Sequence, residues 1–136
     1  MPTPAQIRKL KAAAKAAAGR AYAPYSRFRV GAAVLASSGR IYSGCNVENA
    51  SYGLTNCAER TAIFNAVAAG EKKLRLECVV VYTPTQIATA PCGACRQVIN
   101  EFGPRARVIS CCDSREVLDV TLPALLPDAF GPQDLA

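Results

Sequence analysis

Three cysteines in two short segments place the strongest constraint on how this chain folds. Residues 57–59 read Cys-Ala-Glu, and residues 91–95 read Pro-Cys-Gly-Ala-Cys. Both segments lie where a helix is predicted to begin, and the spacing of Cys92 and Cys95 puts both thiols on one face of the first helical turn. If all three thiolates hold one metal ion, the two helix starts must meet at one edge of the fold.

The ligand set predicts a zinc site with one open coordination position. Thiolates are good zinc ligands, and no fourth Cys or His stands at a suitable spacing, so three protein ligands leave room for water. Helix starts also lower the pKa of thiols, because free N–H groups and the positive end of the helix dipole stabilise the thiolate. The sequence therefore predicts one zinc ion per chain, bound by Cys57, Cys92 and Cys95, in a site of the catalytic kind.

Glu59 is the candidate proton carrier for the water at this site. The chain contains no histidine, so no imidazole can act as the base, and the carboxylate two residues after Cys57 is left by elimination. Three thiolates give the zinc complex a net negative charge, which opposes activation of water. We expect Arg60 and Arg96 to temper that charge by donating hydrogen bonds to ligand sulfurs; the alternative is that both are surface arginines.

Composition favours a single domain, residues 1–136, that keeps its thiols reduced. The length suits one domain, and no apolar run approaches the ~18 residues of a membrane span. The seven cysteines are an odd number and no signal segment opens the chain, so reduced thiols in a cytosol are favoured over a disulfide framework. We therefore expect a cytoplasmic protein without a membrane partner.

The formal charge of +6 is distributed unevenly. No Asp or Glu precedes Glu48, although half of the 16 basic residues lie in that stretch. Such a beginning is typical of organelle transit peptides, but a solvated amphipathic helix is the favoured interpretation, because residues 20–47 already read as folded structure. The basic residues do not cluster into a stripe of the kind that binds nucleic acid, so we expect no nucleic-acid partner.

Residue patterns predict an α/β fold with three layers, α-β-α, around a mixed sheet of about five strands. Ser38-Gly39 is expected to turn a hairpin, and Thr55 or Asn56 to cap the helix that begins at residue 57. The predicted elements, in order, are a helix at 5–18, strands at 28–35 and 40–47, a helix at 57–69, a strand at 76–82, a helix at 92–102, strands at 108–111 and 117–120, and a short helix at 121–126.

Six longer segments share the pattern of one enzyme family. They read Tyr-Ala-Pro-Tyr-Ser at 22–26, Val-Gly-Ala-Ala at 30–33, Gly-Cys-Asn-Val-Glu-Asn-Ala-Ser-Tyr at 44–52, Asn-Cys-Ala-Glu-Arg-Thr-Ala at 56–62, Pro-Cys-Gly-Ala-Cys-Arg-Gln at 91–97 and Leu-Leu-Pro-Asp-Ala-Phe at 125–130. Over residues 5–130 the chain resembles the small, homotetrameric cytidine deaminases. The resemblance implies their fold and their activity as hydrolases: zinc-dependent conversion of cytidine and deoxycytidine to uridine and deoxyuridine, with release of ammonia, in pyrimidine salvage.

The resemblance also implies roles for residues around the metal. Zinc-bound hydroxide attacks C4 of cytosine, and Glu59 moves protons from the water to N3 and to the leaving amine. The residues at the family's substrate-binding positions are Phe28 against the base, Asn46 and Glu48 at the ribose, and Ala58. Without the resemblance, Phe28 reads equally well as a core aromatic and Glu48 as a solvated hairpin charge.

The resemblance further implies a homotetramer whose sites lie near subunit interfaces. The candidates for contact between subunits are Ala50, Tyr52 and Phe130. Assembly of this kind would bury apolar surface that a chain of 14.3 kDa otherwise exposes.

Two other functions remain open from the sequence. One keeps the chemistry but changes the substrate to an aminonucleoside such as blasticidin S; the intact ribose segment at 46–52 argues against it. The other is a non-catalytic zinc module, or a nucleic-acid binder that uses the basic amino-terminal third. A structural zinc site is normally closed by a fourth ligand, and an esterified 3′-oxygen in a nucleic-acid strand has no proton to donate to Glu48. We therefore expect an enzyme that acts on free nucleosides.

Overall fold

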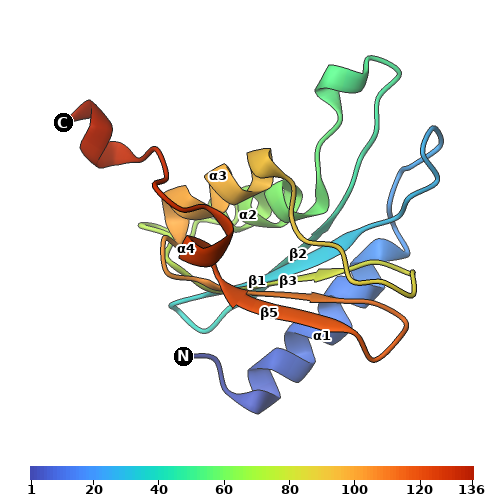
Figure 1. The fold of residues 1–136 in the computed structure, drawn as a ribbon, viewed down its shortest axis with the longest axis horizontal. Helices are drawn as coiled ribbons and strands as arrows, with labels where there is room; N and C mark the ends of the chain where they lie inside the picture. Colours follow the sequence, from blue (N-terminus) through green and yellow to red (C-terminus); the bar gives the residue numbers. More distant parts are fainter.

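Residues 1–136, all described by the computed structural model, form one five-stranded sheet between two layers of helices (Figure 1). The strands are β1 (Gly31–Ala36), β2 (Ile41–Cys45), β3 (Leu76–Tyr82), β4 (Arg107–Cys111) and β5 (Val117–Thr121). The helices are α1 (Pro4–Ala18), α2 (Ala58–Ala68), α3 (Gly93–Phe102) and α4 (Leu122–Leu125), with short 3-10 helices η1 (Tyr52–Leu54) and η2 (Pro132–Leu135). The order of helices and strands is the predicted one.

The sheet is mixed because its strands are joined in two different ways. Short connections make β1 and β2, and β4 and β5, antiparallel neighbours, whereas the crossover through α3 makes β3 and β4 parallel. The strand order is β2-β1-β3-β4-β5. Both β3 and β4 therefore end at the same edge of the sheet, and the connection that leaves β3 at this edge leads to α3.

Helices cover both faces of the sheet (Figure 1). On one face lies α1, whose residues Leu10, Ala14 and Ala18 pack against Leu35, Val80 and Ile109. On the other face lie α2 and α3, whose residues Ala62, Ile63 and Ile99 pack against Val34, Val79 and Val108. Each fully buried Val, Leu or Ile side chain stabilises the fold by roughly 1.5–3 kcal/mol. The predicted three-layer α-β-α fold with a mixed five-stranded sheet is confirmed.

Strand β1 begins three residues later than predicted, at Gly31 rather than Phe28. The reason lies in the partners of the backbone N–H groups before it. The N–H of Phe28 donates to the hydroxyl of Ser26, and the N–H of Val30 donates to Oδ1 of Asn46. Side chains thus accept the hydrogen bonds from N–H groups that a neighbouring strand would otherwise accept, and residues 28–30 lie outside the strand.

Two glycines let the helices approach the sheet beside this extended segment. A Cβ atom added at Gly31 would lie 1.8 Å from the carbonyl oxygen of Ala14 in α1, and one added at Gly44 would lie 2.4 Å from the amide nitrogen of Ala62 in α2. Both distances are too short for any side chain, so bare backbone is required at these two positions. Here α1 and α2 pack directly on the main chain of β1 and β2.

Two segments extend away from the layered body (Figure 1). One is the connection between β2 and α2, which carries η1, and the other is the carboxy-terminal segment with η2. Their apolar side chains include Leu54, which is 70% exposed, and Leu135, which is 79% exposed. None of the helices combines the length and the apolarity that crossing a bilayer requires.

Candidate functional site

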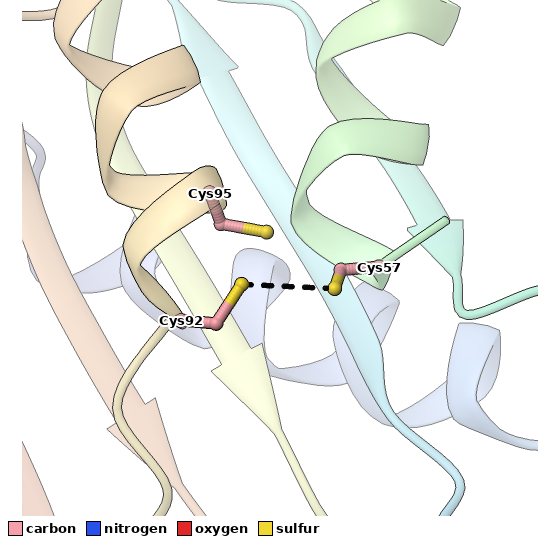
Figure 2. A group of neighbouring side chains, drawn as sticks. All are labelled: Cys57, Cys92 and Cys95. Atoms are coloured by element: carbon pink, nitrogen blue, oxygen red, sulfur yellow. Dashed lines mark hydrogen bonds between the residues drawn. The ribbon is translucent and has the colours of Figure 1, made fainter. Parts of the chain in front are cut away.

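The three predicted metal ligands come together where α2 and α3 begin (Figure 2). Cys57 is the N-cap residue of α2, Cys92 is the N-cap residue of α3, and Cys95 lies in the first turn of α3. The three Sγ atoms lie within 4.8 Å of one another, and those of Cys57 and Cys92 are 3.8 Å apart. The expectation that the two helix starts meet is confirmed.

The cap of α2 was predicted wrongly. Neither Thr55 nor Asn56 is the N-cap; Cys57 is, and it makes no hydrogen bond to the helix backbone through its side chain. The amide of Asn56 instead donates to the hydroxyl of Thr61. The sulfur of Cys57 is thereby left free to face the other two sulfurs.

The cluster fits a zinc ion. With Zn–S bonds of about 2.3 Å, a tetrahedral ion holds pairs of ligand sulfurs about 3.8 Å apart, which is the separation of the Cys57 and Cys92 sulfurs. All three donors are soft thiol groups, which suit zinc better than Ca²⁺ or Mg²⁺. No fourth Cys, His, Asp or Glu belongs to the group. The arrangement thus suits an ion with three protein ligands and one further position.

The electrostatics of the cluster favour a thiolate at Cys57. Its pKa is lowered, first by a hydrogen bond from the thiol of Cys95 and then by Arg60, whose Nη2 atom lies 3.2 Å from the sulfur. The pKa of Cys95 is raised because its proton is shared with Cys57 and because it is buried. The Nε–H of Arg60 is buried without a partner. Arg60 thus contacts a ligand sulfur, as expected.

Arg96 does not make the hydrogen bond to a ligand sulfur that we expected. Its Nε donates to the carbonyl of Pro91 at 2.7 Å, and its Nη1 donates to the carbonyl of Leu125 at 2.9 Å. The reason is its position in α3, from which the guanidinium reaches back to the segment before Cys92. Arg96 therefore holds the backbone that leads into the second ligand segment. Of the two arginines, only Arg60 donates a hydrogen bond to a sulfur of the cluster, that of Cys57.

Glu59 lies in the first turn of α2 beside the cluster, and only 4% of its surface is exposed. Burial raises its pKa to about 7, and the negative charge of a Cys57 thiolate acts in the same direction. A carboxyl group with this pKa exchanges protons readily near neutral pH. Its environment is therefore suited to acid–base chemistry.

A cavity of about 220 Å³ opens beside Cys57, Glu59 and Cys92. It is smaller than the ~300–1,000 Å³ of pockets for drug-sized ligands, which suits a small monomeric ligand. All four residues predicted to bind substrate also line it, namely Phe28, Asn46, Glu48 and Ala58. The structure thus brings the predicted metal, proton-carrying and substrate-binding groups to one place.

Glu48 is anchored as an ionised acceptor, not as a freely solvated charge. Its Oε1 accepts hydrogen bonds from the backbone N–H groups of Tyr25 and Ser26, and its Oε2 accepts one from the hydroxyl of Ser26. These hydrogen bonds, first that of the Ser26 hydroxyl, lower the pKa of Glu48. The carboxylate therefore keeps its negative charge at neutral pH.

Asn46 and Phe28 are joined to one another. Nδ2 of Asn46 donates to the carbonyl of Phe28 at 2.7 Å, and Oδ1 accepts from the N–H of Val30 at 2.9 Å. Phe28 is 40% exposed, so it is not a core aromatic. Phe28 lines the cavity, and its backbone carbonyl is held by the side-chain amide of Asn46.

Several residues that line the cavity were not predicted. They are Ser26, Val30, Thr55, Val81, Thr83, Thr89 and Ala90. Ser26 stands in the Tyr-Ala-Pro-Tyr-Ser motif, which signalled its importance without giving it a role. Thr83 directly follows β3, and the carboxyl end of a parallel strand is a common place for functional residues in α/β folds.

The three candidates for subunit contact lie outside the cavity. Ala50 and Tyr52 belong to the projecting segment before α2, and Phe130 belongs to the carboxy-terminal segment. Tyr52 is 75% exposed and Phe130 is 57% exposed. The carbonyl of Phe130 accepts a hydrogen bond from Gln97 in α3 at 2.7 Å, so the backbone of this segment is fastened while the ring stays exposed.

Comparison with known proteins gives consistent matches over most of the chain. Residues 4–111 match the family model described as the cytidine and deoxycytidylate deaminase zinc-binding region. A cytidine deaminase of Sporosarcina psychrophila is 46% identical over 96% of this chain and 95% of its own length. One of Mycobacterium tuberculosis (strain H37Rv) is 49% identical over 90% of this chain and 87% of its own length. The crystal structure of cytidine deaminase from Burkholderia pseudomallei superposes with a TM-score of 0.84 at 50% identity, covering 90% of this chain and 98% of that one.

Proposed function

The chain belongs to the cytidine and deoxycytidylate deaminase family, and we propose that it hydrolyses cytidine and deoxycytidine to uridine and deoxyuridine with release of ammonia. One observation carries the proposal: the three cysteine sulfurs lie together, and the buried Glu59 lines the same cavity as two of those cysteines, Cys57 and Cys92. Relatives named cytidine deaminase favour this substrate over an aminonucleoside antibiotic. The same relatives, together with the cavity, favour an enzyme over a non-catalytic zinc module or a nucleic-acid binder.

Cys57, Cys92 and Cys95 would hold the zinc ion, which, when bound, lowers the pKa of a water molecule in its fourth position. Glu59 accepts a proton from the attacking water and transfers it to N3 of cytosine. Glu59 then takes the second proton of that water from the hydroxyl group now on C4 and delivers it to the amino group. The C4–N bond breaks, the amino group leaves as ammonia, and the C4 oxygen becomes the carbonyl of uridine. Water and cytidine together account for all the atoms of uridine and ammonia, so no further reactant is needed. Burial of Glu59 keeps bulk water from competing for these protons.

Arg60 offsets the negative charge of the thiolate cluster. Three thiolates outweigh the charge of one zinc ion, and a guanidinium 3.2 Å from the Cys57 sulfur withdraws part of that charge. The Nε–H of Arg60 is buried without a partner and remains available as a second donor in the same region. This makes Arg60 a positioning and charge-balancing residue, not one that touches the reacting atoms.

The far side of the cavity would bind the sugar and the base. Glu48 is ionised and accepts hydrogen bonds, so it recognises a free 3′-hydroxyl, with Asn46 beside it at the ribose. In a nucleic-acid strand that oxygen is esterified and has no proton to donate, which favours free nucleosides over polymers. Phe28 would pack against the base, and Ala58, at the start of α2, lines the same cavity.

We also propose that residues 1–136 form one catalytic domain and that four copies assemble, with Ala50, Tyr52 and Phe130 in subunit contacts. The exposed rings of Tyr52 and Phe130 support this, because association buries such surface. Sedimentation is expected to give about four times the chain mass of 14.3 kDa. The reaction would serve pyrimidine salvage in the cytoplasm, which the reduced thiols of the chain favour.

The deciding experiment follows the loss of ultraviolet absorbance when zinc-loaded protein is incubated with cytidine. Glu59→Gln is expected to keep about one zinc per chain and lose turnover by ~10² or more, because it cannot carry the proton. Glu101→Gln, an exposed carboxylate in α3, is the matched control and should retain activity. No turnover of any free nucleoside by the zinc-loaded protein would refute the proposed function, and equal activity of Glu59→Gln would remove Glu59 from the mechanism.

A further inference from the structure

A short turn links two groups that line the cavity. The hydroxyl of Ser26 donates to Oε2 of Glu48 and accepts a hydrogen bond from the N–H of Phe28 at 3.0 Å. The N–H of Ser26 donates to Oε1 of Glu48 at 3.1 Å. Ser26 is therefore bonded both to the carboxylate on the sugar side of the cavity and to the backbone of the aromatic residue on the base side.

The residue between them is held in an unfavourable conformation. Arg27 has φ = 58°, in the left-handed region that residues with a side chain rarely adopt. The hydrogen bond from Phe28 to the Ser26 hydroxyl closes the turn on one side, and the N–H of Arg27 donates to the carbonyl of Ala23 at 3.0 Å on the other. Strained residues of this kind persist where surrounding contacts fix them, and they concentrate at functional sites.

Counting acceptor positions shows what the turn does to Glu48. A carboxylate offers about four lone-pair positions. The N–H groups of Tyr25 and Ser26 occupy two on Oε1, and the Ser26 hydroxyl occupies one on Oε2. One position therefore remains, on Oε2, and the hydroxyl of Ser26 determines its direction. Without that hydroxyl, the carboxylate would be held only at Oε1, by the N–H groups of Tyr25 and Ser26, and Oε2 would have no partner to fix its direction.

We propose that Ser26 is a positioning residue for substrate specificity: its hydroxyl aims the free acceptor position of Glu48 at the nucleoside 3′-hydroxyl while it holds the backbone of Phe28. The inference rests on the proposed function, which gives Glu48 and Phe28 their ligands. It assigns to Ser26 a role that neither the metal chemistry nor the proton transfer requires. Ser26 lines the cavity and is exposed, so its hydroxyl can be changed without opening a hole in the core.

The test compares cytidine with 3′-deoxycytidine, which lacks the hydroxyl that Glu48 would recognise. Wild-type protein loaded with zinc is expected to prefer cytidine in kcat/KM. In Ser26→Ala this preference should fall about tenfold, since hydrogen bonds to charged groups contribute on that order. Ser26→Thr keeps the hydroxyl and should restore the preference to within about threefold of wild type. A merely structural role would reduce the rates with both substrates equally and leave their ratio unchanged.

Ser38→Ala is the matched control. Ser38 lies in the β1–β2 hairpin, and its hydroxyl also accepts a hydrogen bond from the N–H two residues on, that of Arg40. This variant should keep the wild-type preference. If Ser26→Ala does not fold, Ser26→Cys replaces it, because a thiol of similar shape is a weaker donor and should lower the preference less.

The outcomes separate the two proposals. No deamination of cytidine by the wild-type protein overturns the proposed function and this inference with it. Deamination with an unchanged preference in Ser26→Ala, or with no preference in the wild type, overturns the role of Ser26 and leaves the deaminase activity standing. A fall in preference that Ser26→Thr reverses supports the inference.

Discussion

Replacing Arg60 with alanine tests whether the charge of the thiolate cluster must be balanced. In the structure, Nη2 of Arg60 lies 3.2 Å from the sulfur of Cys57. At this distance Coulomb's law with an effective dielectric constant of about 20 gives about 5 kcal/mol, which is a ceiling because both groups lose hydration. The net value of a hydrogen bond to a charged group is about 1.5–3 kcal/mol. We therefore expect Arg60→Ala to weaken zinc binding or kcat/KM by about 10- to 150-fold.

Two measurements check this prediction. Competition with a coloured chelator gives the zinc affinity, and the absorbance assay with cytidine gives kcat/KM. Arg60→Lys should fall between wild type and Arg60→Ala, because lysine keeps the charge but not the planar pair of donors. Arg8→Ala, on the exposed side of α1, is the control for loss of a positive charge far from the site. If both quantities for Arg60→Ala stay within about twofold of wild type, the charge-balancing argument is wrong.

Three further predictions concern titration, metal removal and a surface ion pair. The pKa of Glu48 is lowered from its ordinary value of 4.5. Glu48 is therefore ionised and contributes to binding at every pH above 4.5, and this contribution is lost only as the pH falls through the lowered pKa. The preference for cytidine over 3′-deoxycytidine should accordingly stay constant from neutral pH down to about 4.5, and a decline beginning near neutrality would contradict the assignment. Removing zinc with a chelator should lower the free energy of unfolding by about 2.7 kcal/mol where free zinc had exceeded its Kd a hundredfold; calorimetry measures this, and an unchanged Tm would speak against binding by Cys57, Cys92 and Cys95. Asp119→Asn should cost less than about 1 kcal/mol in urea denaturation, because the Asp119 and Arg107 side chains are 38% and 30% exposed.

Local patterns were enough to predict most of the fold. Strand β3 was predicted with the observed bounds, because its β-branched run is buried in the centre of the sheet. Helix α1 was predicted within one residue of its start, since its apolar residues recur at helical spacing and a glycine follows its end. The start of β1 was missed because the N–H groups of Phe28 and Val30 donate to the side chains of Ser26 and Asn46, and the apolar pattern of residues 28–30 does not reveal such bonds.

The site could be predicted where the spacing of residues along the chain determines the direction of their side chains. The three cysteines and Glu59 sit at helix starts, where position along the chain determines direction, and the structure brings them together. Arg96 was harder to predict: it follows Cys95 as Arg60 follows Glu59, yet it donates to the backbone carbonyls of Pro91 and Leu125, and the second of these is 29 residues away along the chain. The position of Ser26 between Glu48 and Phe28 depends on a turn whose strain shows only in three dimensions.

The two glycines in β1 and β2 have a consequence for evolution as well as for packing. Gly31 meets the backbone of α1 and Gly44 meets the backbone of α2, on opposite faces of neighbouring strands. Beside the segment that leads into Asn46 and Glu48, each helix therefore lies as close to the sheet as backbone contact allows. Because neither layer can move inward, and outward movement would leave a void, the distance between α1 and α2 is fixed by the main chain. Residues throughout α1, far from any chemistry, are thus free to diverge in their exposed side chains but not in the path of the helix.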